Sequence, residues 1–178
     1  QGKLNGNTVV TTVMSNMGLY KAFESEDINY EQTAVGDKYV AENMLENNYS
    51  IGGEQSGHVI FSRYAATGDG ILTSLMIMEA CVEQKATLCD LAKEMKVYPQ
   101  ILRNVRVADK KTARENPKVV EAVEAAAREL STEGRILVRE SGTEPLIRVM
   151  VEAGTEEICA EHVNNVVRVM EEEGLVVE

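Results

Sequence analysis

The sequence lacks long apolar runs, and this absence bounds the classes of protein that it can encode. No run approaches the roughly 20 apolar residues that a helix needs to cross a bilayer. The segment after Gln1 also has no apolar block of the kind found in secretory signal peptides. We therefore expect a cytoplasmic protein without a membrane partner. Residue 1 is Gln rather than Met, which fits a start inside a longer chain, a processed N-terminus or an engineered cut.

Cysteine is scarce, and its placement argues against three kinds of site. The chain has three cysteines, Cys81, Cys89 and Cys159, which lie far apart in the sequence and form no CxxC pair. This spacing lacks the signatures of a zinc site, a redox dithiol and a disulfide framework. We predict that all three are buried free thiols and that this chain supplies no metal site.

Basic residues are also few. Eighteen Lys and Arg stand against 29 Asp and Glu, which gives a net charge of -11. Such a charge opposes binding to nucleic acid or to an anionic membrane, so any anion site has to be local. The remaining composition, with 44% apolar and 26% charged residues over 178 positions, is ordinary for a globular protein of one domain or two small ones.

Short strand patterns alternate with helical ones in the first half of the chain. We expect strands within 7–14 and 49–64 and helices over 18–24, 37–47, 69–84 and 87–95. The region 49–64 indicates two extended segments around a glycine-rich loop. Helical spacing predicts buried faces made of Val40, Met44 and Leu45 in one helix and of Leu72, Leu75, Met76 and Ala80 in another. Asp37 is the expected N-cap of the helix over 37–47.

A domain boundary is expected at Val97-Tyr98-Pro99-Gln100, where the helical pattern stops at a proline. It divides the chain into domains 1–97 and 98–178. In the second domain we expect strands over 101–107, 135–139 and 146–152 and helices over 116–133 and 155–173. The first of these helices should bury Val119, Val120, Val123, Ala127 and Leu130. The predicted fold class is α/β: a mixed α/β domain, then a small α+β domain with an antiparallel sheet and helices on one face.

A loop with the composition of an anion site lies between the last two predicted strands. It reads Arg139-Glu140-Ser141-Gly142-Thr143-Glu144-Pro145, and Arg148 follows in the next strand. A guanidinium group can bind two phosphate oxygens at once, and hydroxyl groups donate hydrogen bonds to phosphate. A glycine such as Gly142 lets nearby backbone N–H groups turn toward an anion and form a nest. The residues are compatible with a phosphate site and with a tight turn that carries two solvated arginines.

A second polar loop reads Gly52-Gly53-Glu54-Gln55-Ser56-Gly57-His58. Its glycines let the backbone approach a ligand closely, and Glu54, Gln55 and Ser56 offer acceptors and donors suited to the hydroxyls of a polyol. His58 can donate or accept a proton near neutral pH, although a histidine in a loop is more often a plain hydrogen-bonding residue.

Together the two loops resemble those of the α-D-phosphohexomutase superfamily in sequence, order and separation. The resemblance covers essentially the whole chain. It identifies the loop at 53–58 as the sugar-binding loop of the superfamily's third domain and the loop at 139–145, with Arg148, as the phosphate-binding loop of its fourth. The segment 33–40, Thr-Ala-Val-Gly-Asp-Lys-Tyr-Val, and Gln55, where phosphomannomutases usually have Met, resemble the phosphoglucosamine mutases within the superfamily.

The resemblance implies a role for each matching residue. Glu54, Gln55, Ser56 and Gly57 would bind the sugar, and His58 would lie near the reacting end as the candidate catalytic residue. The phosphate that is not reacting would be bound by Arg139, Ser141, Gly142, Thr143 and Arg148. The implied reaction interconverts glucosamine 6-phosphate and glucosamine 1-phosphate through a phosphoserine enzyme and a glucosamine 1,6-bisphosphate intermediate, on the route to UDP-N-acetylglucosamine and the cell wall.

Two parts of the superfamily's machinery are not found in this sequence. The family also uses a phosphorylated serine and an Asp-Gly-Asp-Gly-Asp loop that binds Mg²⁺, both in its first two domains. Here Gly68-Asp69-Gly70 supplies one carboxylate and fits a loop and a helix cap. The chain is therefore expected to bind a hexosamine phosphate without isomerising it, with the N-terminal domains of the same chain as its partner. A phosphomannomutase or phosphoglucomutase fragment and a non-catalytic sugar-phosphate-binding module are the alternatives.

Overall fold

The computed structural model describes residues 2–177 and divides the chain into two compact units, Gln1–Val97 and Tyr98–Glu178. Unit 1 has a sheet of four strands and unit 2 a sheet of three. The mixed α/β fold class predicted from the sequence is confirmed. Over the described residues, no helix is long and apolar enough to span a membrane.

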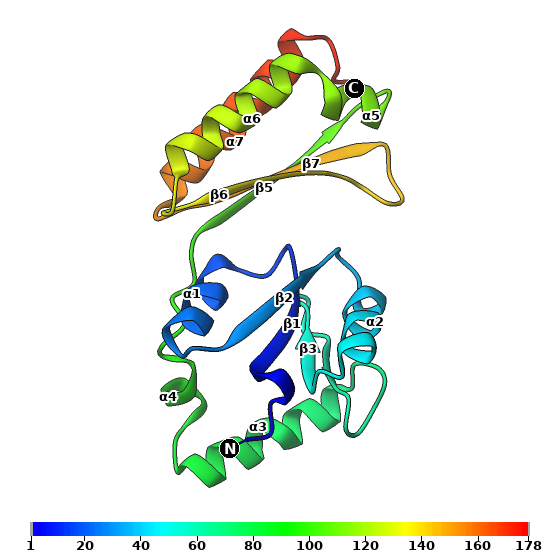
Figure 1. Cartoon of the computed structure of the whole chain (residues 1–178). Helices are drawn as coiled ribbons and strands as arrows, with labels where there is room; N and C mark the ends of the chain where they lie inside the picture. The colour runs from blue at the N-terminus through cyan, green and yellow to red at the C-terminus, as the bar shows by residue number, and fades with distance from the viewer. Residues whose placement is uncertain (1, 178) are drawn as a thin grey trace. The chain divides into compact units, whose positions relative to one another are not determined.

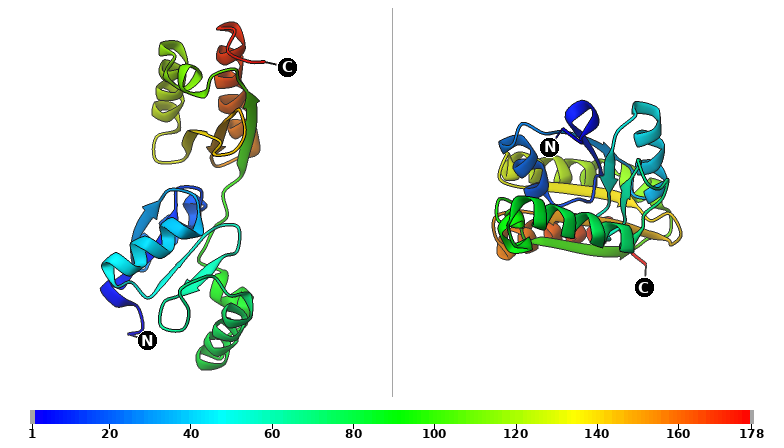
Figure 2. Two further views of the ribbon diagram at one scale, coloured as in Figure 1. Left: turned by 90° about the vertical axis from the view of Figure 1, so that its right-hand side faces the viewer. Right: turned by 90° about the horizontal axis from the view of Figure 1, so that it is seen from below.

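The strands of unit 1 are, in sheet order, β2 (Asn29–Thr33), β1 (Thr8–Thr12), β3 (Ile51–Gly53) and β4 (Val59–Phe61). Its helices are η1 (Asn5–Asn7, a 3-10 turn), α1 (Met17–Ser25), α2 (Asp37–Asn47), α3 (Gly70–Gln84) and α4 (Leu88–Ala92). Strands β2 and β3 run parallel to β1, and β4 runs antiparallel to β3. Helices α1 and α2 make the crossovers and lie on opposite sides of β1 (Figures 1 and 2). The three parallel strands therefore end at one edge of the sheet, where the loops that follow them are neighbours.

The sheet face under α2 carries a small apolar core of Val10, Val40, Met44 and Ile60. Two predictions about α2 are wrong. Leu45 is 85% exposed, because it points about 100° around the helix from Met44 and away from the sheet. Gly36, not Asp37, is the N-cap, and the Asp37 carboxylate instead accepts a hydrogen bond from the Lys38 backbone N–H at 2.9 Å.

Helix α3 was predicted correctly in extent but not in its buried face. Asp69 caps it by accepting from the Ile71 and Leu72 backbone N–H groups, so the cap predicted there is confirmed. Met76 is half-buried, whereas Leu75 is 55% exposed, because it lies on the side of the helix that no element of unit 1 covers. No residue of α3 is fully buried.

The prediction of three buried thiols is wrong in two cases. Cys159 is buried, and burial raises the pKa of its thiol. Cys81 of α3 is only half-buried. Cys89 is exposed, because it lies on the short helix α4, which has no buried residue.

Unit 2 is an antiparallel sheet with strands in the order β5 (Gln100–Arg106), β7 (Leu146–Glu152) and β6 (Arg135–Glu140). Its helices are α5 (Lys110–Glu115), α6 (Pro117–Leu130) and α7 (Glu156–Glu172). Helices α6 and α7 pack side by side over one face of the sheet (Figure 1). The predicted antiparallel sheet with helices on one face is confirmed. Helix α5 was not predicted.

The core of unit 2 lies between β7 and the two long helices, with Ile147, Val149 and Val151 fully buried. The buried face predicted for α6 is partly wrong: Val119 and Leu130 are buried, whereas Val120 is 40% exposed and Ala127 is also exposed. Two alanines, Ala122 and Ala126, occupy the inner face instead. Small side chains there let α6 approach its neighbours closely.

A buried charge lies near the carboxyl end of β7. Glu152 is fully buried, and its carboxylate accepts a hydrogen bond from Arg135 of β6 and one of 3.0 Å from Gln100 of β5. Removing one partner of a buried ion pair typically costs about 3–5 kcal/mol, because the other charge is left uncompensated. Glu152 therefore ties the three strands together at one register.

Gly52→Ala is predicted to destabilise unit 1. The added Cβ would lie 2.6 Å from Met44 Sδ, 2.7 Å from Val40 Cγ1 and 3.0 Å from the Val10 carbonyl oxygen. Overpacking of this kind costs about 1–3 kcal/mol, so the free energy of unfolding measured by urea titration should fall by that amount. Gly70→Ala is the control, because a Cβ there meets nothing within 4 Å. Equal effects of the two substitutions would contradict the packing argument.

Candidate functional site

The sugar-loop candidate joins β3 to β4 at the edge where the parallel strands end. The strand order β2-β1-β3 changes direction at β1, and open α/β sheets bind ligands at such a switch point. Two backbone hydrogen bonds close the loop: the Glu54 N–H donates to the His58 carbonyl at 2.9 Å, and the Gly57 N–H donates to the Glu54 carbonyl at 3.0 Å. Gly57 has φ +95°, a conformation that L side chains rarely adopt, so the turn requires glycine here.

The Glu54 side chain is held in place from a second loop. Its Oε1 accepts a hydrogen bond of 2.9 Å from the Gly36 backbone N–H, in the segment between β2 and α2. Its other oxygen, Oε2, has no hydrogen-bond partner in the part of the chain that the structure describes. Glu54 is thus a half-buried carboxylate with a fixed direction and one oxygen free to accept from a ligand.

The tip of the loop is open to solvent. Gln55, Ser56, Gly57 and His58 are all exposed. Ser56 Oγ lies 3.1 Å from His58 Nδ1, a contact that orients the imidazole and does not involve Nε2. Hydroxyls of a polyol could therefore reach Glu54 and Ser56 without displacing any buried group.

The anion-loop candidate joins β6 to β7 in unit 2. Ser141 is 1% exposed, and its Oγ accepts hydrogen bonds from the Glu144 N–H at 3.3 Å and from Arg148 Nη2 at 3.4 Å. Gly142 and Thr143 are exposed beyond it. A Cβ on Gly142 would meet nothing within 4 Å, and its φ is not in the left-handed region, so the turn itself does not require glycine there.

Two guanidinium groups face each other at the start of this loop. The register of β6 and β7 pairs Arg139 directly with Arg148. Both Nε atoms are buried and have no hydrogen-bond partner within residues 2–177. Arg148 Nη2 lies 3.3 Å from Glu144 Oε2, whereas Arg139 has no carboxylate partner in that range. Burial and the nearby Arg148 charge lower the pKa of Arg139. The pair therefore forms a positively charged site that an anion would stabilise.

Lys110 adds a third cation that the sequence did not predict. Its Nζ donates a hydrogen bond of 2.8 Å to the Ser141 carbonyl oxygen from the start of α5. Within the described residues it has no carboxylate partner. Arg114, one turn further on, pairs with Glu140 at 3.4 Å. Helix α5, which the sequence did not predict, thus contacts the beginning of the anion loop through Lys110 and Arg114.

The described residues do not fit a magnesium ion. Between residues 2 and 177, no three His, Cys, Asp or Glu side chains gather in a way that could hold a metal. The nearest match to the family's acidic loop, Asp69, uses its carboxylate to cap α3.

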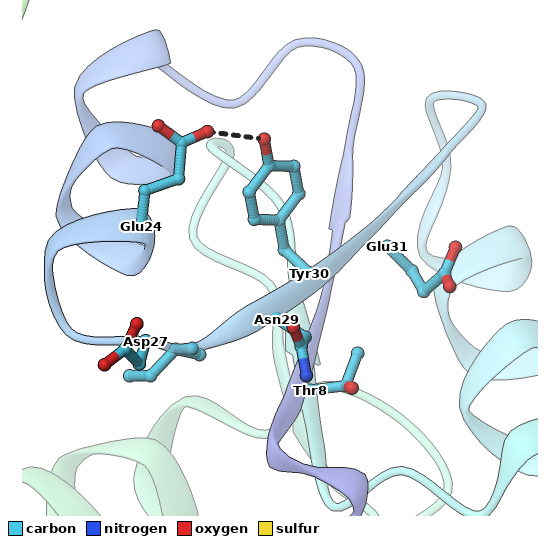
Figure 3. Close-up of a pocket in the computed structure, with 7 residues that line it drawn as sticks. Thr8, Glu24, Asp27, Asn29, Tyr30 and Glu31 are labelled. Atoms are coloured by element: carbon cyan, nitrogen blue, oxygen red, sulfur yellow. Dashed lines mark hydrogen bonds between the residues drawn. The ribbon is translucent and has the colours of Figure 1, made fainter.

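One cavity of unit 1 is unsuited to a phosphorylated sugar. It has a volume of about 590 Å³ and lies beside β2, where Glu24, Asp27 and Glu31 line it (Figure 3). Glu24 accepts a hydrogen bond of 3.1 Å from the Tyr30 hydroxyl, and burial together with this bond raises the pKa of Tyr30. Three carboxylates without a facing cation repel a phosphate.

Two domains of one family match the chain, one in each half. Residues 1–98 match the family described as phosphoglucomutase/phosphomannomutase, alpha/beta/alpha domain III, and residues 102–169 match phosphoglucomutase/phosphomannomutase, C-terminal domain.

Among curated relatives, the chain is 58% identical over 174 residues to phosphoglucosamine mutase of Lachnoclostridium phytofermentans and 59% over 175 residues to that of Lachnospira eligens. In both cases the match covers 98% of this chain and 39% of the relative. The chain therefore spans well under half the length of these relatives.

Among solved structures, Aspergillus fumigatus N-acetylphosphoglucosamine mutase in complex with glucose 1,6-bisphosphate has a TM-score of 0.78 at 19% identity, over 95% of this chain and 39% of that one. The same enzyme with GlcNAc-6P and magnesium gives 0.76 at 20% identity, over 95% and 40%. At these identities the likeness concerns the fold.

Inorganic phosphate is predicted to stabilise unit 2 through the facing arginines. An anion that binds only the folded state raises the free energy of unfolding, so phosphate should do so relative to chloride at matched ionic strength. Arg139→Met removes the repulsion, and without phosphate it should raise stability by about 0.2–1 kcal/mol while losing the effect of phosphate. Arg168→Met, at an exposed position of α7, should keep that effect. A variant at Arg139 that still responds to phosphate would remove the arginine pair from the anion site.

Proposed function

The chain belongs to the phosphoglucomutase/phosphomannomutase family, and we propose that it is the part of a phosphoglucosamine mutase that holds the sugar and the non-reacting phosphate. The whole protein would interconvert glucosamine 6-phosphate and glucosamine 1-phosphate through a phosphoserine enzyme and glucosamine 1,6-bisphosphate. The chain alone, with neither the phosphoserine nor the metal loop of the family, would bind substrate without turning it over. A charged sugar phosphate does not cross a bilayer unaided, which supports the cytoplasm as the compartment of the proposed reaction.

The arginine pair is the observation that carries the proposal. Arg139 and Arg148 face each other, their buried Nε atoms have no hydrogen-bond partner within residues 2–177, and Ser141 lies beside Arg148. Guanidinium groups suit phosphate because they offer parallel N–H donors. We assign Arg139, Ser141, Gly142, Thr143 and Arg148 to the phosphate that is not being transferred. Exposed backbone at Gly142 and Thr143 leaves that phosphate room to approach.

The loop at 53–58 is assigned to the sugar. Glu54 Oε2 and Ser56 Oγ would bind hydroxyls, with Gln55 and Gly57 completing the contact surface. His58 would lie near the reacting end; Ser56 orients its ring through Nδ1, and this contact does not occupy Nε2. One fixed phosphate anchor could serve both orientations of the bisphosphate, because the anchored group is the one that does not react.

The choice of a hexosamine over glucose or mannose rests on the relatives. Those at 58% and 59% identity bear the name phosphoglucosamine mutase. The Aspergillus fumigatus enzyme of similar fold was solved with GlcNAc-6P and magnesium. We propose that magnesium serves the full-length protein with ligands outside this chain. The activities of that protein on glucosamine, glucose and mannose phosphates would test the assignment.

Glucosamine 6-phosphate is predicted to bind this chain weakly and through the anion loop. Its addition should shift the amide NMR signals of Ser141, Gly142 and Thr143, because their N–H groups lie at the proposed anchor. Arg148→Ala should remove the shifts, since it deletes a charged donor, whose hydrogen bond is typically worth about 1.5–3 kcal/mol. Arg168→Ala should leave them unchanged. Unaltered binding by the Arg148 variant would refute the assignment of this loop to the phosphate. Turnover by this chain alone would refute the proposal that it is an inactive part of the enzyme.

A further inference from the structure

Helix α3 displays an apolar stripe to solvent. Ile71, Leu75, Met78 and Val82 are 79%, 55%, 54% and 77% exposed. They are spaced by four, three and four residues, which places them on one side of the helix. This is the spacing with which one helix packs against another. Exposed apolar residues in such a row mark an interaction surface rather than a solvated face.

The core of unit 1 does not account for the stripe. The opposite side of α3, with the half-buried Leu72, Met76 and Ala80, faces inward. Within unit 1, α3 packs mainly against β4 and α4 (Figures 1 and 2). The helix thus has two apolar sides, of which unit 1 covers one.

The N-terminal segment lies against the flank of this helix. Lys3 Nζ is 3.4 Å from Glu79 Oε1 and 3.6 Å from Glu83 Oε1, both on α3. Residues 2–5 also line a groove of about 760 Å³ together with Met76, Ile77 and Ala80. Any polypeptide that leads into residue 2 therefore arrives beside the stripe.

The relatives have such a polypeptide. They share with this chain only 39% of their length, as their C-terminal portion. We propose that the stripe Ile71, Leu75, Met78 and Val82 is covered, in the full-length protein, by a helix of the same polypeptide that lies ahead of residue 2. That helix would present apolar side chains at matching spacing of three and four residues. The inference depends on family membership and not on the assignment of the sugar and phosphate loops.

Hydrogen exchange tests the proposal without any substitution. The amides of 71–84 would be compared between the 178-residue chain and the protein extended by the polypeptide that precedes residue 1. We expect exchange at least about tenfold slower in the longer protein, since packing suppresses local opening. Equal exchange in both, at low protein concentration, would overturn the proposal. If exchange in the short chain instead becomes slower as its concentration is raised, and its measured mass is that of a dimer, the stripe would be assigned to a second copy.

A matched pair of substitutions tests which residues form the contact. Leu75→Ser should leave the urea midpoint of the short chain unchanged, because the side chain is already exposed, and should lower the midpoint of the longer protein. Leu45→Ser, at an 85% exposed position on α2, is the control and should alter neither. If Leu75→Ser had the same effect in both proteins, the covering helix would not be in contact with the stripe.

Discussion

The register of β7 against β6 is the constraint on which the anion site depends. Glu152 of β7 is paired with Arg135 of β6, and four residues further along β6 the same register brings Arg139 opposite Arg148. The buried carboxylate of Glu152 is bound by a residue of each neighbouring strand. Because side chains alternate along a strand, a shift of one residue would turn Arg148 to the other face of the sheet and expose Ile147 and Val149. A charge contact at one end of the sheet thus fixes the distance between two charges at the other.

The facing arginines are unfavourable in the folded chain taken alone. Like charges opposite each other on a sheet cost about 0.2–1 kcal/mol, and both Nε atoms are buried without a hydrogen-bond partner in the described residues. The rest of the fold supports this arrangement, since Lys110 and Arg114 of α5 hold Ser141 and Glu140 from outside. The net charge of -11 belongs to the chain as a whole, whereas Arg139, Arg148 and Lys110 place positive charge locally at this loop, as a local anion site would require.

The sugar-loop candidate of unit 1 is positioned in a different way from the anion loop. Its position follows from parallel strands that end at one edge, and its carboxylate is fixed by a backbone N–H from the next loop along that edge, at Gly36. A carboxylate oxygen and a serine hydroxyl suit a ligand part that carries hydroxyls, whereas guanidiniums suit a part that carries negative charge. Under the proposed function, the loop of unit 1 would bind hydroxyl groups and the loop of unit 2 a phosphate group.

The sequence alone determined the features whose causes are local. Glycine and polar residues clustered between strand patterns predicted both loops, the alternation of Ile147, Val149 and Val151 predicted β7, and Asp69 predicted the start of α3. The family resemblance added roles for loop residues, which spacing alone does not give.

Only the tertiary structure decided which faces are covered and which charges meet. Leu45, Leu75 and Val120 fit a helical apolar pattern, yet they are exposed, because spacing defines a face of a helix and the neighbouring elements decide whether it is buried. Helix α5 is six residues long with one buried side chain, too short for a periodic signal, so Lys110 was missed. The pairing of Arg139 with Arg148 needed the strand register, since residues nine positions apart become neighbours only when two strands align.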